Sequence, residues 1–132
     1  MPRLEKQAAD NAIARLKDGA YYSNVAKQIA NEKDLNTQIR KYLELVEKVQ
    51  DLYTLQSDLE WLNVEAVKLA FADMKKQKGY DAAKYEPMLN ELVQLEKKGF
   101  KGIYNGDEQA IADAKKALEC KRAILLANPL LD

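Results

Sequence analysis

The sequence predicts an all-α protein: an antiparallel helical bundle of four to six helices with one Gly-rich loop. Three observations support this fold class. Helix-favouring residues (Ala, Leu, Lys, Glu and Gln) are abundant, apolar residues recur at steps of three and four, and alternating apolar/polar strand runs are missing. The 132 residues suit one domain, which would bury about two-thirds of the surface its unfolded chain exposes. We therefore expect residues 1–132 to form a single helical domain.

Two short helices are expected first. Residues 4–17 place small and apolar side chains three or four apart, and Gly19 follows as a favoured residue just beyond a helix end. The inner positions of this helix are Leu4, Ala8, Ala12 or Ile13, and Leu16. A second helix is predicted from Ser23 as N-cap to about Asn31, because a serine hydroxyl can accept a hydrogen bond from the first turn.

Residues 35–79 carry two apolar stripes that do not line up. The first is Ile39, Tyr42, Val46, Val49 and Tyr53, and the second is Leu52, Leu55, Leu59, Leu62, Ala66 and Leu69. Either one long helix rotates its apolar face, or the chain breaks near residues 53–57. Ser57 with Glu60 three residues later has the form of a capping box and favours the break. Lysines and Gly79 are expected to end the later helix.

Two further helices are expected after Gly79. Asp81 is a plausible N-cap, and Pro87 either lies in the first turn of the next helix or kinks one that began earlier. The apolar face of this helix is Met88, Leu92 and Leu95. The predicted loop contains Gly99, Gly102 and Gly106. Asp107 would then cap a last helix to about Ala127, with Ile111, Ala114, Leu118 and Leu125 facing inward.

The residue inventory argues against enzymatic chemistry. The chain has no histidine, which excludes catalytic triads, Glu-x-x-His di-iron sites, imidazole zinc sites and c-type haem attachment. Glu44, Glu47 and Asp51 are interspersed with lysines and indicate a solvated helix face. The acidic run after Asn105 lacks the alternating carboxylates of a calcium loop and is typical of a turn and helix cap. We expect no catalytic, cofactor-binding or metal-binding residues, and no cofactor.

Charge and hydropathy argue against nucleic acid and a membrane span. Basic and acidic residues both number 21, so no net field favours nucleic acid, and "KKQKGYDAAKY" is interpreted as a helix end with solvated lysines. The single Cys120 is predicted to be a buried or half-buried thiol, and Trp61 and the tyrosines to pack between helices. No run approaches the roughly 20 apolar residues of a membrane span. The start of the chain has no apolar signal region, which leaves the compartment open.

The end of the chain, "ALECKRAILLANPLLD", resembles a segment of large exported bacterial proteins similar to the alpha subunit of hydrazine synthase. In such proteins a helix ending in this way leads into a β-propeller-like domain. "GYDAAKY" and "GFKGIYNGDEQAI" are similar to the helical region before that junction. The resemblance covers about the last third of the chain. No catalytic residue transfers with it, because those enzymes hold haem through Cys-x-x-Cys-His motifs and this chain has one cysteine and no histidine.

The resemblance implies a helical domain of a longer periplasmic or cell-surface protein, with the domain junction at residues 128–132. Asn128, Pro129, Leu130 and Leu131 would dock on the following domain. The leading hypothesis is thus a non-catalytic accessory domain that packs on or orients a larger domain of the same exported polypeptide. The alternative is a free-standing helical adaptor, possible also in the cytoplasm, that binds a partner helix or peptide in a groove. A small-molecule-binding bundle ranks third.

Overall fold

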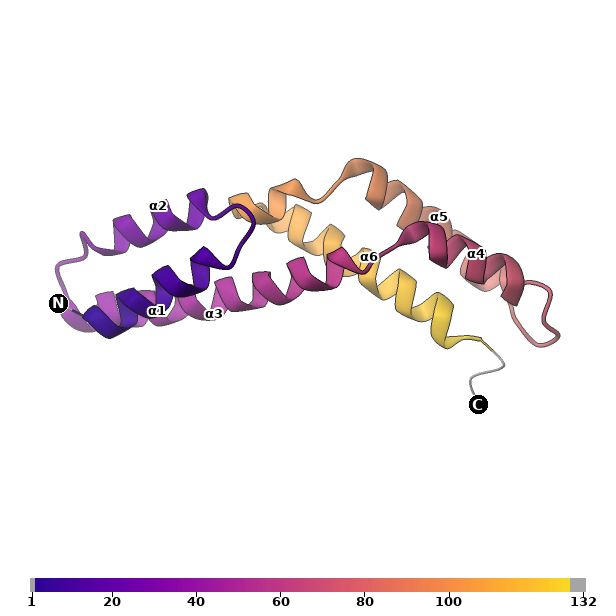
Figure 1. Cartoon of the computed structure of the whole chain (residues 1–132), viewed down its shortest axis with the longest axis horizontal. Coiled ribbons are helices and arrows are strands. Elements are labelled where there is room, and N and C mark those ends of the chain that lie inside the picture. The colour runs from indigo at the N-terminus through magenta and orange to yellow at the C-terminus, as the bar shows by residue number, and fades with distance from the viewer. Residues whose placement is uncertain (1, 129–132) are drawn as a thin grey trace. The chain divides into compact units, whose positions relative to one another are not determined.

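The computed structural model describes residues 2–128, and the regular elements in this part of the chain are all helices, with no strand (Figure 1). The predicted all-α fold class is confirmed. The described elements are α1 (Arg3–Ala14), α2 (Ala20–Ile29), α3 (Leu35–Glu60), α4 (Val64–Met74), α5 (Ala82–Lys98), the 3₁₀ helix η1 (Lys101–Asn105) and α6 (Glu108–Leu126).

The chain divides into two compact units. The first contains the residues up to Ser57 together with Gly102–Asp107, and the second contains Asp58–Lys101 together with the residues from Glu108 onward. Each unit has its own apolar core.

In the first unit, α1 and α2 form a helical hairpin whose tight turn depends on Gly19 (Figure 1). A Cβ atom at position 19 would lie 2.7 Å from Cγ2 of Ile13, so only glycine allows this close approach. Gly19 has a φ of −107° and is the N-cap of α2. The prediction of Ser23 as N-cap was wrong, because Ser23 lies inside a helix that already begins at Ala20.

Helix α3 runs without a break through residues 53–57, so the predicted break there was wrong. Its buried face has a regular spacing of four and three that takes members from both predicted stripes, and no rotation of the face is needed. The buried positions are Gln38, Tyr42, Leu45, Val49, Leu52, Leu55 and Gln56. Two of them are glutamines, which a search for apolar stripes passes over.

The break lies after Glu60, and Asn63 replaces Ser57 as the residue that starts the next helix. Asn63 has a φ of 40°, a left-handed conformation that asparagine tolerates better than most residues. Its side chain accepts a hydrogen bond from the Ala66 amide at 3.2 Å. The break resets the helical phase, so Leu69 of the predicted stripe is exposed and α4 instead buries Val64, Val67, Phe71 and Met74.

In the second unit, α4, α5 and α6 pack around one core (Figure 1). Asp81 is the N-cap of α5 as predicted, accepting a hydrogen bond from the Lys84 amide at 3.2 Å. Pro87 lies inside α5, so the helix begins before it. Gly99 and Gly106 adopt positive φ on either side of η1, so the predicted Gly-rich loop contains a short 3₁₀ helix.

Helix α6 buries a slightly different face from the one predicted. The buried residues are Ala114, Ala117, Cys120 and Ile124, whereas Ile111, Leu118 and Leu125 are only partly buried. Two of the buried positions, Ala117 and Cys120, carry small side chains, which a search for the largest apolar residues does not anticipate. Cys120 is buried, as predicted, and desolvation raises the pKa of its thiol, which disfavours the reactive thiolate form.

Candidate interaction surface

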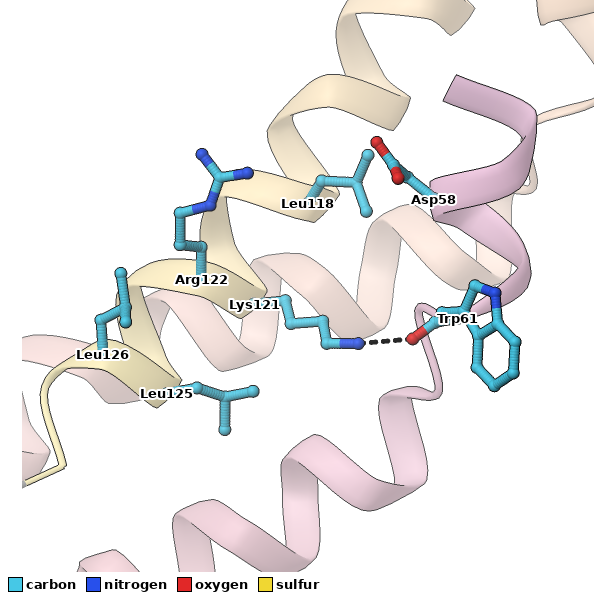
Figure 2. Close-up of a pocket in the computed structure, with 7 residues that line it drawn as sticks. All are labelled: Asp58, Trp61, Leu118, Lys121, Arg122, Leu125 and Leu126. Carbon is cyan, nitrogen blue, oxygen red and sulfur yellow. Dashed lines mark hydrogen bonds between the residues drawn. The ribbon is translucent and has the colours of Figure 1, made fainter. Parts of the chain in front are cut away.

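An open groove of about 360 Å³ lies in the second unit, between helix α6 and the C-terminal end of α3 (Figure 2). Asp58 and Trp61 form one side. The α6 side is formed by Leu118, Lys121, Arg122, Leu125 and Leu126. We refer to these seven residues as the Trp61 groove.

The groove exposes two large apolar side chains. Trp61 is 78% exposed and Leu126 is 68% exposed. The expectation that Trp61 packs between helices was wrong, because α3 ends at Glu60 and the chain turns at once into α4. The sequence signal that could have identified this surface is the chain's single tryptophan placed immediately before a helix break. Exposed aromatic and leucine side chains on one surface are typical of interaction surfaces.

Charged groups on the two sides of the groove differ in sign. The Lys121 ammonium donates a hydrogen bond to the Trp61 carbonyl oxygen, which joins α6 to the end of α3 (Figure 2). Arg122 is exposed, and within residues 2–128 no carboxylate forms an ion pair with it. Among the described residues that line the groove, Asp58 is the single carboxylate. The α6 side is therefore cationic and the α3 side carries one negative charge.

The predicted junction residues begin beside this groove. The Asn128 amide donates to the Leu125 carbonyl at 3.3 Å, so Asn128 follows directly from the last turn of α6. Pro129, Leu130 and Leu131 lie outside the described residues. Leu125 and Leu126 belong both to the groove and to the turn that leads into the junction.

A hydrogen bond within the second unit also holds the C-terminal end of α6. The Tyr80 hydroxyl donates to the Ile124 carbonyl at 3.4 Å, which satisfies one of the carbonyls that a helix end leaves without an intrahelical partner. Tyr80 stacks on Tyr85 with 5.6 Å between ring centroids. The last turn of α6, and with it the groove, is thus held by the core beneath it.

A second, smaller groove of about 170 Å³ lies in the first unit between α1 and α3. Its lining residues are Ala8, Asn11, Ala12, Arg15, Val46, Gln50 and Tyr53. The Arg15 guanidinium lies 4.0 Å from the centroid of the Tyr53 ring. Leu4 and Leu43 precede Ala8 and Val46 by one helical turn and are 83% and 53% exposed.

Carboxylates are dispersed rather than clustered. Over residues 2–128 no group of three or more His, Cys, Asp or Glu side chains is close enough to hold a metal ion. Glu44, Glu47 and Asp51 are all exposed, as a solvated face requires. None of the described helices is both long and apolar enough to cross a membrane.

Comparison of the chain with protein families, curated proteins and solved structures finds no match.

Proposed function

We propose that this chain is a non-catalytic accessory domain that packs on a larger domain of the same exported polypeptide. The observation that carries the proposal is the Trp61 groove, whose exposed tryptophan and Leu126 lie beside the turn that leads into Asn128. A domain that follows Asn128 would begin within a few residues of this apolar surface. Periplasmic or cell-surface location belongs to the same proposal, through the resemblance to exported proteins.

The geometry supports docking because the groove is both apolar and firmly supported. Trp61 is tied to α6 through the bond from Lys121 to its carbonyl, and the last turn of α6 is tied to the core through Tyr80. A surface fixed in this way loses little conformational entropy when a partner covers it. Burying the exposed parts of one tryptophan and one leucine would contribute on the order of 1.5–3 kcal/mol for each side chain that becomes fully covered.

Cysteine labelling tests the proposal. Leu126→Cys is introduced into the 132-residue chain and into the longer polypeptide of the native reading frame, and alkylation rates are compared. The native Cys120 is buried and gives a low background. We expect Leu126→Cys to react much more slowly in the longer polypeptide. Leu69→Cys is the matched control, since Leu69 is 70% exposed and lies on α4 away from the groove, and its rate should be unchanged.

Equal rates for Leu126→Cys in the two proteins would contradict the proposal. A reading frame that stops after Asp132 would contradict it as well, because no larger domain would follow.

The groove between α1 and α3 favours a second candidate function, a free-standing adaptor that binds a partner helix. Ala8, Ala12 and Val46 are small enough for a helix to approach closely, and the exposed leucines at one end extend the apolar surface. Ala12→Arg would fill this groove and should abolish binding of a helical partner. Ala14→Arg, at an exposed position on the same helix outside the groove, is the control and should leave binding intact.

A further inference from the structure

We propose that the Trp61 groove receives a protein segment that carries apolar side chains next to a carboxylate, with the carboxylate pairing to Arg122. The inference rests on the proposed docking function and specifies the chemistry of the docked segment. Three observations support it (Figure 2): the lining includes three leucines, the α6 side is cationic, and Asp58 lies on the opposite side.

The apolar part of the occupant follows from the lining. Leu118, Leu125 and Leu126 offer contacts for leucine-sized or aromatic side chains on the α6 side, and Trp61 lies at the opposite edge with its indole directed away from α6 (Figure 2). A volume of about 360 Å³ accommodates only a few such side chains. The groove is open, so the occupant remains partly solvated and must supply polar groups at its edge. A short amphipathic segment meets both conditions.

The carboxylate follows from Arg122. A segment lying on Leu118 and Leu125 would cover part of Arg122, which is on the same side of the groove. Covering a guanidinium without a partner is unfavourable, whereas a carboxylate can accept two parallel hydrogen bonds from it. Of the two cations that the structure places along the groove within residues 2–128, Lys121 already donates to the Trp61 carbonyl, which leaves Arg122 for this contact. Tryptophan and arginine are also the residue types that most often dominate binding energy.

Asp58 restricts the orientation of the segment. It lies on the α3 side, and a partner carboxylate placed there would be repelled. The segment should therefore direct its carboxylate toward α6. Two features argue against an anionic membrane surface as the occupant. Asp58 would repel anionic lipid headgroups, and the chain as a whole has no net positive charge.

A displayed library of random 12-residue peptides tests the inference. Peptides are selected on the 132-residue chain and counter-selected on Trp61→Ala, and an enriched peptide is synthesised with its acidic residue intact and with that residue replaced by the corresponding amide. Binding is followed by fluorescence of Trp61, the chain's single tryptophan. We expect enriched peptides to combine apolar residues with Asp or Glu, and Arg122→Gln to weaken binding of the acidic peptide about tenfold.

The decisive readout is a double-mutant cycle. If Arg122 and the peptide carboxylate interact, Arg122→Gln and the amide replacement each weaken binding, but together they weaken it little more than either alone. Lys116→Gln, an exposed position of α6 outside the groove, is the control and should have little effect. Additive losses, or no enrichment of peptides that survive the counter-selection on Trp61→Ala, would overturn the inference.

Binding to lipid vesicles distinguishes a membrane surface from a protein partner as the occupant of the groove. A shift of Trp61 emission on mixing with phosphatidylserine-containing vesicles would overturn the inference in favour of a lipid surface, and no shift supports it. The cysteine-labelling experiment is independent of the peptide assay. Slower labelling of Leu126→Cys with no peptide selectivity would leave the docking function standing and reject only the chemistry assigned to the segment.

Discussion

Gln38 and Gln56 lie on the same buried face of α3, about five helical turns apart, and each satisfies backbone groups at one end of α2. The Gln38 side-chain amide donates to the carbonyls of Ile29 and Ala30, both at 3.2 Å, where α2 ends. Gln56 Oε1 accepts from the Lys17 amide at 2.8 Å, in the turn that precedes α2. The two glutamines therefore fix the register of the hairpin against α3.

Replacing Gln56 should destabilise the first unit. Gln56 Oε1 also accepts a hydrogen bond from the Tyr104 hydroxyl at 2.8 Å, so Gln56→Met removes the acceptor of two donors. We expect the free energy of unfolding to fall by about 1–3 kcal/mol, from the loss of two partly buried hydrogen bonds at about 0.5–1.5 kcal/mol each. Denaturant midpoints measure the loss. Gln50→Met is the control at an exposed position of the same helix, and an equal loss there would contradict this role.

The position of the helix break can be tested with two alanine substitutions. Ser57 lies inside α3, so Ser57→Ala should leave stability unchanged or slightly increase it. Asn63→Ala removes the N-cap of α4 and places a Cβ-bearing residue without a polar side chain in the left-handed region. The expected loss is about 1–2 kcal/mol. A larger loss for Ser57→Ala than for Asn63→Ala would place the break where the capping-box pattern suggested.

These two positions show how far the sequence alone determines the fold. Periodicity and composition predict the helices and the Asp81 cap, because those depend on neighbours in the chain. The cap at position 57 was wrong because the Ser-x-x-Glu pattern is local, whereas the continuity of α3 depends on packing against residues distant in sequence. Trp61 was misassigned for the same reason, since exposure depends on which helices surround a residue.

The ion pair between Lys98 and Asp113 should make stability depend on pH. Lys98 Nζ lies 2.8 Å from Asp113 Oδ2, and this bond, with a second from Gln109, lowers the pKa of the Asp113 carboxyl. A carboxyl whose pKa is lower in the folded state stabilises the fold above its unfolded pKa, near 4. The contribution is lost as the pH falls through the folded value. Lys98→Met should flatten a plot of Tm against pH in the acidic range, as the pH falls below the unfolded pKa. An unchanged plot would contradict the assignment.

Deleting residues 130–132 tests whether the end of the chain serves a junction. If Leu130 and Leu131 dock on a following domain, they contribute nothing to the stability of the 132-residue chain. The deletion should then leave both the unfolding midpoint and the emission maximum of Trp61 unchanged.

If the leucines instead fill the Trp61 groove of their own chain, the deletion would shift Trp61 emission toward longer wavelength, because water would reach the indole. It would also lower stability by several kcal/mol for two fully buried leucines. That result would contradict the junction and leave the adaptor, with its separate groove between α1 and α3, as the better-supported function.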